Sequence, residues 1–132
     1  MARRLLLALW AGVLVSIGGL AAPTLFHMLA SPAVASRVAA ELFERTTILS
    51  AACALALLVL GAADRAASVR LKVAPLWPAL ALGVNSVVLR SLMDGAPRAS
   101  DFPLWHSLAV LLYVAATGGV LALLVLELRR DR

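Results

Sequence analysis

The sequence predicts an all-α integral membrane protein, a four-helix bundle with a short amphipathic helix between the first and second spans. The composition is the first observation, because 63% of the 132 residues are hydrophobic and 14% are charged. Soluble domains have roughly 45–50% and 25%. The mean hydropathy of +0.97 leaves too little polar surface to cover a globule, so the apolar excess faces lipid. The whole chain, residues 1–132, then forms one transmembrane domain.

Four long stretches without charged residues are the second observation. A charged side chain at the bilayer centre costs at least about 2.5–3.5 kcal/mol, so uncharged stretches mark the spans. The predicted spans are residues 5–26, 46–63, 73–93 and 103–126. Pro23 is expected to kink the end of the first span. Pro75 and Pro78 suit the first turn of the third span, which reaches Met93 if Arg90 snorkels outward.

The segment between the first two spans predicts the additional helix. Ser31 and Pro32 are typical of an N-cap followed by proline at the first helical position. Apolar residues then recur at helical spacing while charged residues gather on another side, which is typical of a helix lying in the membrane interface. The apolar set is Val34, Val38 and Leu42, and the charged set is Arg37, Glu41 and Glu44. This helix can continue directly into the second span.

The basic residues predict the orientation, because they are retained on the cytoplasmic side. With the N-terminus inside, the cytoplasmic segments hold eight of the twelve, namely Arg3, Arg4, Arg65, Arg70, Lys72, Arg129, Arg130 and Arg132. The whole formal net charge of +5 then lies on the inner face. We therefore expect an inner-membrane protein with both termini in the cytoplasm, with no nucleic-acid partner behind the pI of 11.1. Trp10 and Trp77 are expected at the inner interface and Trp105 at the outer.

The first span also imitates a cleavable signal peptide. Arg3 and Arg4, a leucine-rich run and the small residues of 19–21 fit that pattern. Charge cannot decide between the two, because cleavage would leave the later spans in the same orientation. The uncharged sequence that continues through 22–26 favours a retained helix.

Several segments resemble domain-of-unknown-function family 4149, which includes relatives of eukaryotic transmembrane protein 205. They are residues 18–26 (GGLAAPTLF), 41–43 (ELF), 84–85 (VN), 102–106 (FPLWH) and 126–128 (LEL). The resemblance covers nearly the whole chain and implies a small four-helix membrane protein with no settled biochemical role. The chain departs from the family pattern at His27, Ala109 and Tyr113, where a basic residue, a serine and an asparagine are expected.

A fainter similarity extends to the copper-resistance CopD type and the HemJ type of protoporphyrinogen oxidase, through the glycine-rich first helix. The HemJ pattern requires a histidine early in the first span and a lysine within the third, and this chain has neither.

Soft and basic side chains gather near the outer face under this topology. They are His27, Met28, Met93 and His106. Imidazole suits haem iron, copper and zinc, and thioethers suit Cu(I), so a haem or copper site is one interpretation. Ordinary interfacial histidines and packing methionines are the other. If helices 1 and 4 pack closely, the two histidines are expected to approach one another.

A second set of polar residues is expected deeper in the bundle. Cys53, Asn85 and Tyr113 lie at one level, about seven residues from the outer ends of their helices, and Thr117 follows Tyr113 on the same helix face. Asn85 should point inward and find a partner among them, because an unsatisfied amide in hydrocarbon is costly. These residues act either as links between helices or as the lining of a small polar cavity. Cys53 is expected to be an inert packing residue.

The sequence therefore predicts a non-enzymatic membrane protein, either an accessory subunit or a binder of a small ligand. The single cysteine excludes an intramolecular disulfide, and no hydrolase, metalloprotease or phosphate-loop motif occurs. No cofactor is expected, with haem or copper as the alternative. Small residues at 12, 18 and 19 and at 115, 116, 118 and 119 permit close packing of helix 1 on helix 4 or on a second copy, so a homo-oligomer or a membrane partner protein is open.

Overall fold

The computed structural model describes residues 1–64, 68–89, 91–92 and 102–130, and in these residues all regular structure is helical. The elements are α1 (Ala2–Ser16), the π-helix η1 (Ile17–Ala21), α2 (Ala22–Met28), α3 (Pro32–Ala63), α4 (Val69–Val73), α5 (Leu76–Val84), the π-helix η2 (Asn85–Leu89) and α7 (Phe102–Arg129). Four helical segments are long and apolar enough to cross a membrane: Ala2–Met28, Ala33–Ala63, Val69–Val88 and Pro103–Arg129. The predicted all-α membrane fold is confirmed.

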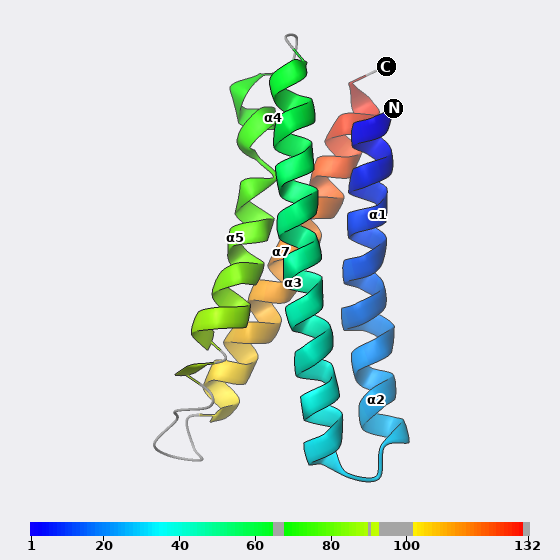
Figure 1. The fold of residues 1–132 in the computed structure, drawn as a ribbon, viewed down its shortest axis with the longest axis vertical. Coiled ribbons are helices and arrows are strands. Elements are labelled where there is room, and N and C mark those ends of the chain that lie inside the picture. Colours follow the sequence, from blue (N-terminus) through cyan, green and yellow to red (C-terminus); the bar gives the residue numbers. More distant parts are fainter. Residues whose placement is uncertain (65–67, 90, 93–101, 131–132) are drawn as a thin grey trace.

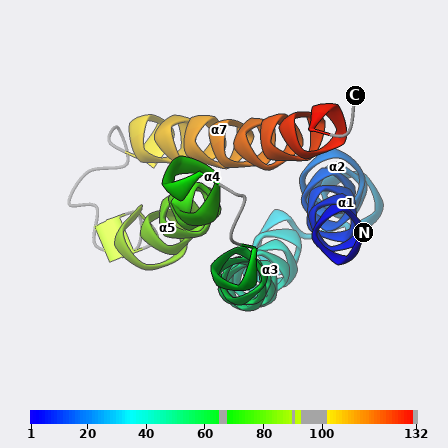
Figure 2. The same ribbon diagram turned by 90° about the horizontal axis from the view of Figure 1, so that it is seen from above.

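The helices run up and down, so that both termini lie at one end of the bundle (Figure 1). We call this end, which holds the start of α1, the end of α3, α4 and the end of α7, the terminal end. The opposite end, with the end of α2 and the starts of α3 and α7, is the distal end. Helix α7 crosses the others at an angle, from beside α5 and η2 to beside α1 (Figures 1 and 2). Helix α3 packs against α1 and α5 on the other side.

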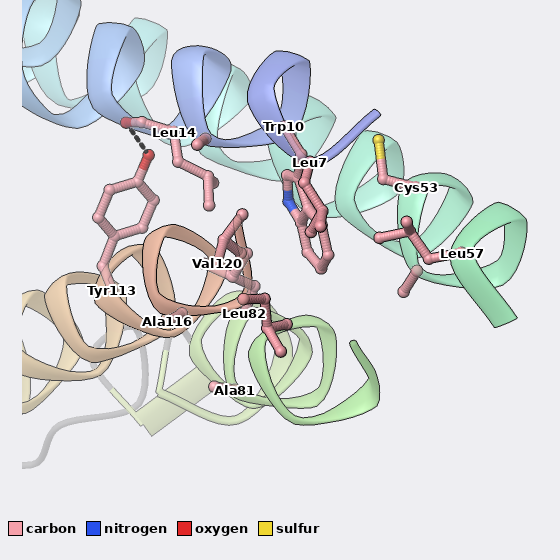
Figure 3. Close-up of a cluster of buried hydrophobic side chains, with 13 residues drawn as sticks. Leu7, Trp10, Leu14, Cys53, Leu57, Ala81, Leu82, Tyr113, Ala116 and Val120 are labelled. Atoms are coloured by element: carbon pink, nitrogen blue, oxygen red, sulfur yellow. Dashed lines mark hydrogen bonds between the residues drawn. The ribbon is translucent and has the colours of Figure 1, made fainter. Parts of the chain in front are cut away.

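The core lies in the terminal half of the bundle, where α1, α3, α5 and α7 meet (Figure 3). Leu7, Trp10 and Leu14 of α1 are buried there, at the spacing that puts one helix face inward. Trp10 has no exposed surface, so its indole packs between helices and does not face lipid.

Helix α3 joins the predicted amphipathic helix and the second span, the continuation that the sequence left open. It begins at Pro32, as expected, and continues as one helix of 32 residues to Ala63. No glycine or proline interrupts residues 33–60, so nothing breaks the helix at the membrane boundary. Ala35 and Ala39 are buried in the distal half, where α3 packs against α2. The charged side chains Arg37, Glu41 and Glu44 are exposed.

The first and third spans are less regular than predicted. The first span is continuous from Ala2 to Met28, and the π turns of η1 immediately precede Pro23, whose ring cannot fit a regular α-helical ladder. The third begins as the short helix α4, turns at 74–75 and continues as α5, with Pro75 as N-cap. Its predicted end at Met93, with Arg90 snorkelling, lies outside the described residues. The fourth span extends to Arg129, beyond the predicted 126.

Candidate functional site: polar links between the helices

Tyr113 of α7 inserts its phenol into the hydrogen-bond ladder of the first span. Its hydroxyl donates to the carbonyl oxygen of Leu14 at 2.7 Å (Figure 3). The backbone amide of Gly18, which a regular α-helix would direct at Leu14, faces the same phenol oxygen. A side chain inserted in this way is a known cause of helix irregularity, and η1 begins at Ile17. Phe43 of α3 packs edge-on against the phenol ring, with centroids 5.1 Å apart.

The close approach of Tyr113 requires glycine at position 18. A Cβ atom added to Gly18 would lie 2.5 Å from Cε1 of Tyr113, well inside any real contact. A Cβ atom on Gly12 would have no described neighbour within 4 Å. Gly18 is therefore fixed by packing of helix 1 on α7, as the small-residue pattern predicts, whereas Gly12 is not.

Asn85 forms a second link to α7 from the start of η2. Its side-chain Nδ2 donates to the carbonyl oxygen of Ala109 at 3.1 Å, one helical turn before Tyr113. The amide is partly buried and has a protein partner, as expected for an asparagine within a span. However, this partner is a backbone carbonyl. It is not one of the polar side chains, Cys53, Tyr113 or Thr117, that were expected to bond to Asn85.

The predicted polar level does not form a shared cavity. Thr117 donates back to the carbonyl oxygen of Tyr113 in its own helix, at 2.9 Å. Cys53 is a buried free thiol in the core of α3. The bonds of Asn85, Tyr113 and Thr117 go to three different backbone carbonyls. These groups therefore act as links between or within helices.

A third link joins α1 to α3 and was not expected from sequence. The indole nitrogen of Trp10 donates to the hydroxyl of Ser50 at 2.9 Å, and that hydroxyl donates to the carbonyl oxygen of Thr46 at 2.7 Å. All three residues are buried. The sequence does show a tryptophan and a serine inside predicted spans, and both side chains require hydrogen-bond partners there. It does not show which helices face each other, so the pair could not be predicted.

The terminal end holds a buried ion pair, also missed from sequence. Arg3 Nε of α1 lies 3.4 Å from Glu127 Oε1 of α7, and both side chains are 10% exposed. The guanidinium also donates to the carbonyl oxygen of Leu57 at 3.2 Å and to that of Leu71 at 3.4 Å. Arg3 therefore connects α1 to α3, α4 and α7. Gly61 makes room for it, since a Cβ there would lie 2.8 Å from Arg3 Nη1.

Arg130 extends this ion cluster to the end of α3. Its guanidinium donates to Asp64 at 3.2 Å and to Glu127 at 3.5 Å. The hydrogen bond that Arg130 donates to Asp64 raises the pKa of Arg130, which therefore stays charged. Arg3 Nε and Glu127 Oε2 are the buried side-chain polar atoms without a hydrogen-bond partner among the described residues, and both belong to this cluster.

The predicted metal ligands are not brought together. His27 and Met28 are exposed at the end of α2, which lies beside α3, whereas His106 is exposed near the start of α7, beside η2 (Figures 1 and 2). These two places are on opposite sides of the distal end, so the expected approach of the histidines is wrong. Met93 lies outside the described residues. Within the described part of the chain, no three His, Cys, Asp or Glu residues are grouped to hold a metal ion.

The surface beside η1 and α2 carries an open groove of about 480 Å³. It is lined mainly by apolar residues, including Leu20, Leu25 and Leu42, with the hydroxyls of Ser16 and Thr24. Because it lies on a membrane-spanning segment and is open, lipid chains can fill it.

Comparison with known proteins gives a family and no closer relative. No curated protein and no solved structure matches the chain. The model of one family, described as a domain of unknown function, DUF4149, matches residues 5–131. That range includes the membrane-spanning helices apart from residues 2–4 of the first one, and all the helix links described above except those of Arg3. The chain therefore belongs to the DUF4149 family.

Proposed function

We propose that this protein is a non-enzymatic subunit of the cell inner membrane that acts through contacts with a membrane partner, either another protein or further copies of itself. The observation that supports this most is the use of its interior polar groups. The hydrogen bonds and ion pairs of the described interior groups lie between helices or within one helix, where they stabilise the fold.

The buried polar side chains support the proposal one by one. Thr46 and Ser50 bond to carbonyls of their own helix, and Tyr113 to a carbonyl of the first span. Arg3 and Glu127 bond to each other. The thiol of Cys53 is buried in the apolar core, and apolar surroundings disfavour the thiolate that a nucleophile needs.

The charge distribution supports cytoplasmic termini. The terminal end holds most of the basic residues, and the described ion pairs there use its acids, Asp64 and Glu127. An excess of Lys and Arg in short loops and tails favours retention in the cytoplasm. The proposed orientation therefore places the distal end, with His27 and His106, outside.

Two measurements test the non-enzymatic proposal against the haem or copper alternative. They are an absorption spectrum and a metal analysis of the full chain, purified in detergent from its native membrane. We expect no Soret band and no stoichiometric metal. A Soret band or near-stoichiometric copper that disappears in both His27→Ala and His106→Ala would contradict the proposal and support the alternative. That alternative has less support, because the two histidines lie on opposite sides of the distal end.

A further inference from the structure

We propose that residues 68–77 at the terminal end form a surface that binds the phosphate headgroup of an anionic phospholipid. This segment comprises Ser68, α4, the turn at 74–75 and the first residues of α5. It combines exposed apolar side chains with two basic side chains that have no acidic partner among the described residues. It lies where α3 ends and the third span begins, at the level of both chain termini (Figure 1).

The apolar part of the surface is exposed although it lies next to the core. Val69 is 73% exposed, and Val73, Leu76 and Trp77 are each between 39% and 49% exposed. Such side chains at the end of a membrane span are suited to the boundary between acyl chains and headgroups, and tryptophan is enriched there. Trp77 is held in place by α7, since a Cβ on Gly119 would lie 2.7 Å from its indole nitrogen.

The basic part consists of Arg70 and Lys72. Neither forms an ion pair within the part of the chain that the structure describes. The acids of the terminal end that are described, Asp64 and Glu127, pair instead with Arg130 and Arg3. The described acids therefore leave the two cations of α4 able to bind an anionic group.

The position of α4 is fixed by the buried ion cluster. Arg3 holds the carbonyl oxygen of Leu71, the residue between Arg70 and Lys72, and the Ser68 hydroxyl accepts from the amide of Leu71. The two cations are thus presented from a backbone that is anchored to α1. An anionic phospholipid satisfies both parts of the surface, because its phosphate meets the cations while its chains meet the apolar side chains.

Native mass spectrometry of the full chain in detergent tests this proposal, with phosphatidylglycerol and phosphatidylcholine as the added lipids. We compare the wild type with R70Q/K72Q and with the matched control R37Q/R45Q, which removes two positive charges from exposed residues near the distal end. Each cation near an anionic membrane surface contributes about 1 kcal/mol. Loss of two should weaken phosphatidylglycerol binding roughly 30-fold. Circular dichroism checks that each variant remains helical.

The expected result is preferential binding of phosphatidylglycerol that weakens at least tenfold in R70Q/K72Q and less than twofold in R37Q/R45Q. Equal weakening in both variants would show an effect of net charge alone and overturn the proposal, as would no weakening in either. Inorganic phosphate added in millimolar excess should leave the bound lipid in place. Displacement by phosphate would show a site for the free ion, which also overturns it.

Discussion

Tyr113 and Gly18 act as one unit. The phenol hydroxyl donates to the carbonyl oxygen of Leu14 in the first span, and Gly18 leaves the space that the phenol ring occupies. Hydrogen bonds between membrane helices contribute on average about 0.6 kcal/mol. The steric fit therefore contributes more than the hydroxyl does, because an added methyl group in a closely packed site costs about 1–3 kcal/mol. This difference makes the glycine the better test of the link.

We expect Gly18→Ala to lower the free energy of unfolding by about 1–3 kcal/mol, because the new methyl group displaces the Tyr113 ring. In a Tyr113→Ala background the same substitution should cost almost nothing, since the ring is gone. Gly12→Ala is the matched control and should not destabilise, because its Cβ enters open space. Unfolding in micelles measures all of these variants. Equal costs of Gly18→Ala in both backgrounds would contradict the described contact.

The ion pairs of the chain differ in burial and should differ in their contribution to stability. Glu127→Ala leaves Arg3 buried without its partner and should cost about 3 kcal/mol of unfolding free energy. Glu41→Ala breaks the exposed pair with Arg45 and should cost about 0.3–0.5 kcal/mol. The same unfolding measurement compares them, and a similar small cost for both would mean that the terminal-end pair is open to water.

At the scale of elements, α3 is a single helix that extends beyond the membrane span into the charged segment of Arg37 to Arg45. Glu44→Pro should therefore cost about 3 kcal/mol or more, because proline removes a ladder hydrogen bond and clashes with the preceding turn. Glu44→Ala is the control for loss of the side chain alone. If the two variants unfold alike, the helix is already broken near this position, as a separate interfacial helix would require.

The sequence predicts the helices themselves, but it does not predict the contacts between them. The lack of charges predicted the long helices, and Ser31 with Pro32 predicted where α3 begins, because both signals are local. Pro23 is a local signal for an irregular end of the first span, but the bond from Tyr113 to the carbonyl oxygen of Leu14 joins residues 99 apart along the chain, so no local pattern contains it. The same holds for Arg3, whose partners are set by which helix ends meet. His27 and His106 were expected to be neighbours from small residues that prove to serve other contacts, such as Gly119 with Trp77.

For the whole molecule, the four membrane-spanning segments place both termini at one end, and the basic residues predict that this end is cytoplasmic. In the proposed orientation the segment after the third span is outside, so alkaline phosphatase fused after Arg98 should be active. A fusion after Arg70 should be inactive. The opposite pair of activities would reverse the proposed orientation.

The central claim is that this protein acts through contacts in the membrane, since its polar interior is used to join helices. The most direct measurement is the protein mass of the particle that contains the chain, extracted in mild detergent from native membranes at native expression and analysed by light scattering. We predict a discrete complex larger than the 13.8 kDa of one chain, containing a partner protein or further copies. A particle that contains a single chain and no other protein would contradict the claim.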